Sequence, residues 1–278
     1  MTIAVTGATG HLGRLAISDL KSRNAPVVAL ARDPAKATDL GVPTRAFDYT
    51  APAGHTAALA GIDTLVLISS SDFNDRAGQH KAVIAAAKAA GVGRIIYTSI
   101  LKGDASPLLL AADHIATEAA ILASGLPYTI LRNGWYTENY TGSLKASVEH
   151  GALIGASADG RIASAARADY AEAIAVTALD DSHAGKTYEL AGDIPHTMAD
   201  FAAEVSKQTG KAIPFNTLPK DTYAGILQSL GLPEAFAGIL ADSDDTAATG
   251  SLLDESHTLS KLIGRPTTPI AETIKAAL

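Results

Sequence analysis

Residues 3–15, IAVTGATGHLGRL, decide how the rest of this chain is interpreted. Ile3 to Thr6 are β-branched or small, which predicts a short buried strand. Three glycines, Gly7, Gly10 and Gly13, follow at three-residue spacing and lead into an apolar helical pattern. In that order such glycines permit a sharp turn, a close approach of the backbone to a diphosphate, and close packing of the helix on the sheet. The position of the triplet, between a strand and a helix, predicts a dinucleotide-binding loop.

The composition excludes several classes of protein. With 278 residues, 47% hydrophobic and 18% charged, the chain can bury a large core and does not resemble a disordered protein. A net charge of −7 without a run of Lys and Arg argues against nucleic-acid binding. No cysteine is present, so disulfides, thiol nucleophiles and cysteine-ligated metals are excluded. The eight histidines are scattered without HExxH spacing, and we expect no metal site.

The location expected from the sequence is the cytoplasm. The N-terminus enters the first strand without a basic and then apolar leader, and no apolar stretch is long enough to cross a bilayer. The absence of cysteine fits a reducing compartment.

Apolar strand-like runs alternate with helical runs in the first half of the chain. The predicted strands cover 26–31, 42–47, 63–68, 94–98 and 128–131, and the predicted helices cover 75–90 and 111–124. This alternation predicts an α/β fold with a doubly wound parallel sheet covered on both faces. Ligands of such sheets bind beyond the carboxyl ends of the strands.

The second half has a mixed pattern. Helices are expected at 141–150, 169–179, 198–209, 219–230, 233–240 and 269–277, with a short strand at 187–190 that can join the main sheet. We predict a dinucleotide-binding domain over 1–132. A smaller mixed α/β lobe over 133–278 would cover the cofactor and contribute partly to the first domain. The acidic run at 242–245, DSDD, is expected to be a solvated loop.

The residue that ends the second predicted strand indicates the nucleotide. NAD-selective proteins place an acid here to bind the ribose 2′-hydroxyl, whereas this chain has Arg32, with Lys36 close behind. A guanidinium pairs with a 2′-phosphate, so NADP is favoured over the alternative of an ordinary surface arginine. Asp33 precedes Pro34 and is expected to cap a helix. Asp48 is either an acceptor for the adenine amino group or a turn residue.

The chemistry is constrained by a missing pair. Short-chain dehydrogenases move the alcohol proton with a tyrosine and a lysine four residues later, but none of the eight tyrosines has that lysine. Tyr128 and Arg132 come nearest and lie on a predicted strand, where they cannot act as one unit. Ser99 stands alone at the end of its strand. Alcohol oxidation is therefore disfavoured, while a quinone accepts hydride readily and needs no enzymatic acid.

With these residues in view, the chain resembles the type-2 NADPH:quinone oxidoreductases, in the NmrA-like, atypical branch of the short-chain dehydrogenase/reductase superfamily. The likeness runs over the full length. It is carried by GATGHLG (7–13), ARDPAKA (31–37), LISSS (67–71), QHKAVIAAAKAAGV (79–92), YTSIL (97–101), LRNGWYTENY (131–140), RADYA (167–171) and KLIGRPTTPIAET (261–273).

The resemblance implies a site for NADP(H) and a quinone. The diphosphate would be held by Gly7, Ala8, Thr9, Gly10, His11 and Leu12, and the 2′-phosphate by Arg32. The inner half of the cofactor would be lined by Ser69, Ser70 and Ser71, and its nicotinamide end by Asn133, Gly134, Trp135, Tyr136, Thr137 and Glu138. Asn139 and Tyr136 are the candidates to bind a quinone oxygen, each with the alternative of a structural loop residue. Trp135 is either a packing anchor or a wall of the acceptor pocket.

The leading hypothesis is an NADPH-dependent quinone reductase, NAD(P)H dehydrogenase (quinone), whose partner is a small-molecule quinone or a related electron acceptor. One alternative is an NmrA-like redox sensor that binds NADP without turnover. Another is a reductase of triphenylmethane dyes or other xenobiotics. A homodimer is an open alternative for the oligomeric state.

Overall fold

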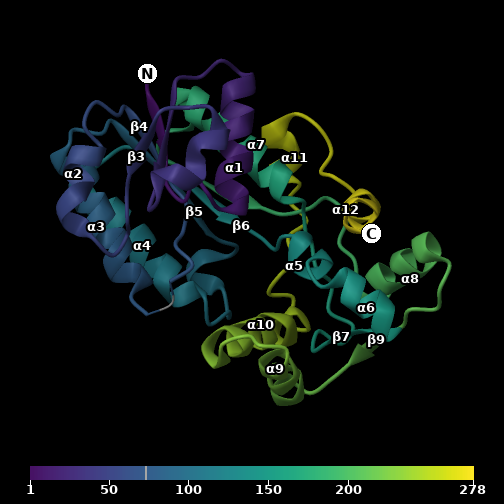
Figure 1. Ribbon diagram of the computed structural model, residues 1–278. Coiled ribbons are helices and arrows are strands. Elements are labelled where there is room, and N and C mark those ends of the chain that lie inside the picture. Colours follow the sequence, from purple (N-terminus) through teal and green to yellow (C-terminus); the bar gives the residue numbers. More distant parts are fainter. Residues whose placement is uncertain (73) are drawn as a thin grey trace. The chain divides into compact units, whose positions relative to one another are not determined.

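The computed structural model describes residues 1–72 and 74–278 and has the predicted α/β architecture (Figure 1). The strands are β1 (Ile3–Val5), β2 (Val27–Ala31), β3 (Thr44–Ala46), β4 (Thr64–Leu67), β5 (Arg94–Ile100), β6 (Tyr128–Asn133), β7 (Leu153–Gly155), β8 (Lys186–Leu190) and β9 (Phe215–Thr217). The α-helices are α1 (His11–Ser22), α2 (His55–Ala58), α3 (Arg76–Ala89), α4 (Ala111–Ser124), α5 (Glu138–Thr141), α6 (Leu144–His150), α7 (Arg167–Leu179), α8 (Met198–Thr209), α9 (Lys220–Ser229), α10 (Glu234–Ala247), α11 (Thr258–Ile263) and α12 (Ile270–Ala277). The 3₁₀ helices are η1 (Pro34–Leu40), η2 (Pro52–Gly54), η3 (Gly103–Ala105) and η4 (Asp181–His183).

Seven strands form the main sheet in the order β3-β2-β1-β4-β5-β6-β8. The first six pair in parallel, with Ile3 opposite Val27 on one side and Thr64 on the other. β1, β2, β4 and β5 are buried along their whole length, which explains their continuous apolar sequences. The doubly wound parallel sheet predicted from the sequence is confirmed, and the short strand near residue 187 does join it.

Helices cover both faces of this sheet. In Figure 1, α2, α3 and α4 lie along one side and α1 and α7 along the other. On the α3 side, Val83, Ile84 and Ala87 pack with Leu65 and Ile95 in one buried apolar cluster. The apolar faces of these helices are thus used against the sheet, as their spacing predicts.

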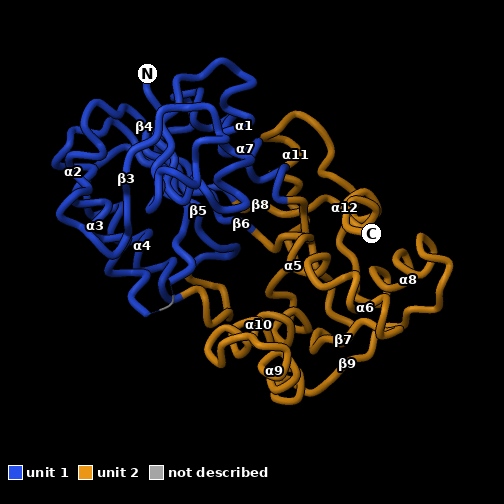
Figure 2. The backbone as a smooth tube through the Cα atoms, in the orientation of Figure 1, with its two compact units in different colours: residues 1–103, 112–133, 167–188 blue, residues 104–111, 134–166, 189–278 orange. Residues whose placement is uncertain are grey.

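The chain divides into two compact units that interleave along the sequence (Figure 2). Unit 1 comprises residues 1–103, 112–133 and 167–188 and holds the main sheet up to the first part of β8. Unit 2 comprises residues 104–111, 134–166 and 189–278. Each unit is described by itself below.

In unit 2, the segment 162–166 pairs with two other parts of the chain. Its residues Ala165 and Ile162 form isolated bridges to Tyr136 and His196, respectively. A Cβ at Gly192 would overlap the Ser164 carbonyl oxygen, so only glycine permits this close approach of two backbone segments. A separate two-stranded parallel sheet pairs β7 with β9.

The prediction that residues 242–245 form a solvated loop is wrong. They lie on α10, and Asp242, Ser243 and Asp244 are buried. Asp242 Oδ1 accepts from Lys220 Nζ at 2.6 Å, and Asp244 Oδ2 accepts from the Ala156 amide. Burial raises the pKa of Asp244 to about 6. The acidic run was misread because its partners come from α9 and from the end of β7, far away in sequence.

Candidate functional site

The glycine loop after β1 has the conformation that its spacing predicts. Gly7 adopts a left-handed φ of +59°, and its carbonyl oxygen accepts from the Gly10 amide at 2.9 Å. A Cβ at Gly13 would overlap the Gly7 carbonyl oxygen, which explains the need for glycine where α1 meets the loop. A Cβ at Gly10 would meet only that oxygen, at 3.2 Å, because the exposed side of Gly10 faces open space.

The start of α1 fits a diphosphate. Gly10 caps the helix without a side-chain hydrogen bond, and the first turn of α1 holds no acidic residue. Thr9, Gly10 and His11 are exposed, so the backbone around them is accessible. The first amides of a helix point along a positive dipole, so this end of α1 attracts an anion. Arg14 braces the loop by donating to the Thr9 carbonyl oxygen at 3.2 Å and to Asp39 Oδ2 at 2.6 Å.

Arg32, at the end of β2, is exposed and forms no ion pair with any residue in 1–72 or 74–278. Asp33 caps η1 by accepting from the Ala35 amide at 3.1 Å, which confirms its predicted capping role. Asp48 Oδ1 accepts from the Thr50 amide and hydroxyl, at 3.0 and 2.9 Å. These bonds hold the pKa of Asp48 below its usual range, and the charge of Arg32 acts in the same direction. The guanidinium and this carboxylate therefore share one region of unit 1.

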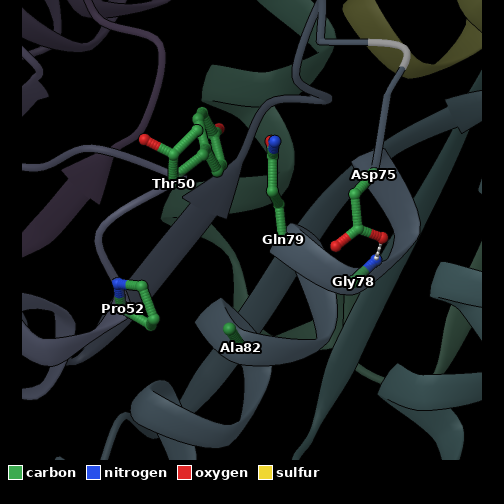
Figure 3. Close-up of a pocket in the computed structure, with 7 residues that line it drawn as sticks. Thr50, Pro52, Asp75, Gly78, Gln79 and Ala82 are labelled. Carbon is green, nitrogen blue, oxygen red and sulfur yellow. Dashed lines mark hydrogen bonds between the residues drawn. The ribbon is translucent and has the colours of Figure 1, made fainter.

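A pocket of about 350 Å³ is lined in part by Tyr49 and Thr50, the two residues that follow Asp48 in the sequence (Figure 3). One wall comes from Tyr49, Thr50 and the first residue of η2, and the other from the N-cap and first turns of α3. The lining residues are Tyr49, Thr50, Pro52, Asp75, Gly78, Gln79 and Ala82. In Figure 3, Gln79 lies between Thr50 and the Asp75 carboxylate, whose dashed bond to Gly78 caps α3.

The serine segment after β4 is held by α3. The Ser70 amide donates to His80 Nε2 at 3.0 Å, and Ser70 Oγ donates to Gln79 Oε1 at 3.1 Å. His80 Nδ1 faces the Thr117 hydroxyl at 3.0 Å. Burial, reinforced by the charge of Arg76, lowers the pKa of His80 to about 3, so the ring stays neutral and can accept. Ser70 is thus held by side chains nine and ten residues further along the chain.

Ser99 belongs to a buried charged network. Its hydroxyl donates to Glu118 Oε1 at 2.5 Å, and Arg132 Nη2 pairs with Glu118 Oε2 at 2.7 Å. A Cβ at Gly103 would overlap the Arg132 guanidinium, so a glycine there leaves room for this group. Because its proton is already committed, Ser99 has a structural role.

Tyr97 is also committed to the interior. It is fully buried, its hydroxyl lies 2.8 Å from His114 Nδ1, and burial raises its pKa. Burial lowers the pKa of His114 to about 3. A buried tyrosine and a neutral buried histidine do not form an accessible acid. Among the residues that the structure describes, no group of three or more His, Cys, Asp or Glu could hold a metal ion.

The segment after β6 runs from Asn133 in unit 1 into unit 2. Thr137 is buried, Trp135 and Tyr136 are half-buried, and Asn139 is exposed. The Thr137 amide donates to the Ala165 carbonyl oxygen at 2.9 Å, and the Ala165 amide donates to that of Trp135 at 3.1 Å. This strand-like pairing fixes the backbone of the segment, whose roles remain the predictions made from the resemblance.

The fold and the loop define an NAD(P)H-binding protein, and the comparisons agree. The family model described as NAD(P)H-binding matches residues 7–181, and the chain belongs to this family. It is 52% identical over 277 residues to quinone oxidoreductase 2 of Escherichia coli K12, covering 98% of this chain and 97% of that protein.

Two solved structures extend this likeness. The NADPH complex of the E. coli NADPH-dependent quinone oxidoreductase has a TM-score of 0.95 and 51% identity, with 99% of each chain covered. The Citrobacter triphenylmethane reductase complexed with NADP(H) has a TM-score of 0.94 and 37% identity, covering 99% of this chain and all of that one. The chain is a full-length homologue of these enzymes, and the predicted relationship to the quinone oxidoreductases is confirmed.

The sequence did not predict several side chains that hold the serine segment and residues 135–138 in place. Glu118, Ser164 and His196 lie in ordinary helical or mixed stretches without a motif, and His80 lies in the quoted stretch 79–92 without a role predicted for it. The only signal was their polarity at positions where an apolar residue was expected, which identifies a buried polar residue but not its partner.

Proposed function

We propose that this protein is an NADPH-dependent reductase that transfers hydride to quinones. The observation that carries the proposal is the start of α1, an accessible helix end without a side-chain cap behind a glycine turn, together with Arg32 at the end of the neighbouring strand. The 52% identity to E. coli quinone oxidoreductase 2 over the whole chain supports the choice of acceptor.

In unit 1, the backbone of residues 7–12 would hold the diphosphate of NADPH. Arg32 would pair with the 2′-phosphate, since its guanidinium has no ion pair elsewhere within the described ranges. The pocket lined by Tyr49, Thr50 and Gln79 is offered to the adenine, and Asp48, which precedes Tyr49 in the sequence, is the predicted acceptor for its amino group. Ser69, Ser70 and Ser71 would line the inner half of the cofactor, and Ser70 is anchored to His80 and Gln79 of α3.

In unit 2, we assign Gly134, Trp135, Tyr136, Thr137 and Glu138 to the nicotinamide end, continuing from Asn133. Tyr136 and Asn139 would orient the acceptor, and the exposed Asn139 amide offers an N–H donor toward a quinone oxygen.

NADPH, when bound, supplies the hydride. The protein holds the acceptor in place and stabilises the negative charge that develops on its oxygen. No protein acid is required, because water can protonate the hydroquinone anion. The commitment of the Ser99 and Tyr97 hydroxyls to Glu118 and His114 agrees with this chemistry.

The direct test follows the loss of NADPH absorbance with a panel of quinones and triphenylmethane dyes. Quinones are expected to support faster turnover than dyes, and calorimetry should give tighter binding for NADPH than for NADH. Binding of NADPH without turnover of any acceptor would instead support the sensor alternative. Preferential turnover of dyes would favour the chemistry of the Citrobacter relative.

Two further expectations belong to this proposal. No helix in the described part of the chain is long and apolar enough to cross a membrane. A cytoplasmic location stays a prediction, supported by the absence of cysteine and checked by cell fractionation. A homodimer also stays a prediction, checked by sedimentation of the purified protein.

A further inference from the structure

Three buried side chains of unit 2 form a chain of hydrogen bonds. Thr137, Ser164 and His196 are 0%, 4% and 4% exposed. Thr137 Oγ1 lies 2.9 Å from Ser164 Oγ, which lies 2.9 Å from His196 Nε2. The other ring nitrogen, His196 Nδ1, lies 3.2 Å from the Thr197 carbonyl oxygen.

The direction of this chain follows from its last member. A carbonyl oxygen only accepts, so Nδ1 of His196 carries the proton and Nε2 is the acceptor. The single Ser164 hydroxyl proton is therefore donated to Nε2. Ser164 Oγ in turn accepts from the Thr137 hydroxyl, and every polar atom of the chain has a partner. Burial lowers the pKa of His196 and keeps its ring neutral, as this arrangement requires.

The backbone around the chain is fixed on both sides. Ala165 pairs with Tyr136, while Ile162 and His196 exchange amide-to-carbonyl bonds of 2.8 and 3.0 Å. Ser164 lies between Ile162 and Ala165, so the backbone that carries its side chain is paired on both sides. Main-chain pairing sets the position of the Thr137 backbone, and the side-chain bonds remove its remaining freedom to rotate.

We infer that His196 and Ser164 are positioning residues for the reaction, because the hydrogen bonds from Thr137 to Ser164 and from Ser164 to His196 hold residues 135–138 in the conformation that binds cofactor and acceptor. This inference rests on the proposed assignment of these residues to the nicotinamide end. His196 and Ser164 do not contact the reactants in this scheme, and they act through Thr137.

The protein contains a fluorescent reporter of this segment that does not depend on catalytic activity. Trp135 is the single tryptophan of the protein and lies two residues before Thr137. Acrylamide quenching of its fluorescence, measured without NADPH, reports how tightly this segment is held. Ser206→Ala is the matched control, because the Ser206 hydroxyl also makes two hydrogen bonds in unit 2, of 2.9 and 3.2 Å to Ile213.

Ser164→Ala and His196→Leu should each raise the quenching constant of Trp135 about twofold, since loss of a buried network loosens the segment that it holds. With a quinone, kcat should fall about tenfold while the Kd for NADPH changes less than about threefold, because misplacement affects the reacting end more than the phosphates. His196→Gln offers a carbonyl acceptor to Ser164 and should recover most of both losses. Ser206→Ala should match the wild type in quenching and kcat.

The outcomes separate this inference from the proposed function. If Ser164→Ala and His196→Leu fold but quench like the control, or if quenching rises while kcat is unchanged, the inference is overturned. If His196→Leu fails to fold, Ser164→Ala and His196→Gln decide the result by the same readouts. An absence of quinone turnover in the wild type would overturn the proposed function instead, and it would leave the quenching comparison readable.

Discussion

Two segments assigned to the cofactor are held in opposite ways. The glycine loop of residues 7–13 is shaped by its own backbone, through a left-handed Gly7, a bond from the Gly10 amide and the close approach of Gly13. Residues 135–138 instead depend on partners elsewhere in the chain. Ser164 lies 27 residues beyond Thr137, and His196 lies 32 residues beyond Ser164.

This difference teaches where specificity for the phosphates and for the acceptor is encoded. A loop that folds from local geometry can be kept while the rest of the sequence changes, and it offers the same cradle to any dinucleotide. A segment held by remote side chains can be reshaped by substitutions far from the site. We therefore expect binding of the phosphates to be sensitive to the loop itself, and acceptor choice to be sensitive to its supports.

The strongest way to break the glycine loop is Gly10→Val. The exposed side of Gly10 faces open space, so the new side chain should fill the position of the diphosphate and abolish measurable NADPH binding. Calorimetry measures the affinity, and thermal unfolding checks the fold. Gly225→Val, at a helical glycine with no atom within 4 Å of a Cβ, should bind like the wild type. Unchanged affinity in Gly10→Val would show that the diphosphate binds elsewhere.

Arg32→Glu tests whether this region selects the phosphorylated cofactor. Losing a charge-assisted contact costs about 1.5–3 kcal/mol, so the ratio of NADH to NADPH Kd should shift by roughly 10- to 150-fold, and repulsion adds to this. Titrations with both cofactors give the ratio. Lys211→Glu, an equal change of charge at an exposed lysine, should leave it unaltered. Equal weakening of both cofactors by Arg32→Glu would mean that the arginine has a structural role.

Asn139→Ala probes the acceptor end. The amide is expected to stabilise charge developing on the quinone oxygen, but its exposure to water weakens the effect. A loss of about tenfold in kcat is expected, below the about 2.7–4 kcal/mol of an enclosed donor. Steady-state kinetics measure the loss, and Asn216→Ala, at another exposed asparagine, is the control. A kcat equal to that of the control would place Asn139 outside the acceptor site.

Acid should act more strongly on segments held by buried titratable side chains than on the glycine loop, whose side-chain brace from Arg14 to Asp39 is exposed. The pKa of His80 is lowered to about 3, so the unfolded chain binds its proton more readily. The contribution of neutral His80 to the free energy of unfolding is complete above about pH 6.5. It is lost by about 1.4 kcal/mol per pH unit as the pH falls toward 3. Asp244, with its pKa raised to about 6, acts in the opposite direction between pH 6 and about 4.

Denaturant unfolding from pH 6 to 4 measures this dependence. The slope of the free energy of unfolding against pH should be less positive in His80→Gln than in the wild type, by about 1.4 kcal/mol per pH unit. Asp244→Asn should change the slope in the other direction. Identical slopes in the wild type and His80→Gln would contradict a neutral, buried His80.

The smallest effects on catalysis are expected from the buried and half-buried tyrosines. Tyr97→Phe removes the bond to His114 and should cost about 1–3 kcal/mol of stability, yet kcat with a reactive quinone should stay within about twofold. Tyr136→Phe should also retain most of kcat, because no protein acid is required. A loss of several orders of magnitude in either variant, with normal NADPH binding, would reveal a tyrosine acid and reopen carbonyl substrates.

The sequence predicted the features that depend on residues close together in the chain. The strand–glycine–helix unit, the parallel sheet and the Asp33 cap follow from neighbouring residues, and the structure confirms them. Short motifs spread over the full length of the chain, such as NGWYTENY, led to the correct family. What could not be predicted depends on distant partners. Asp242 and Asp244 look like solvent-exposed acids until Lys220 and Ala156 are placed beside them.

The interleaving of the two units has a consequence for synthesis on the ribosome. In unit 1, Arg23 at the end of α1 bonds Glu172 on α7, a residue made 149 positions later. At about 5–20 residues per second, α1 waits roughly 7–30 s for this neighbour. During that interval residues 134–166 of unit 2 are already emerging. The nascent chain therefore carries the α1 surface that α7 later covers in an exposed state through much of its elongation.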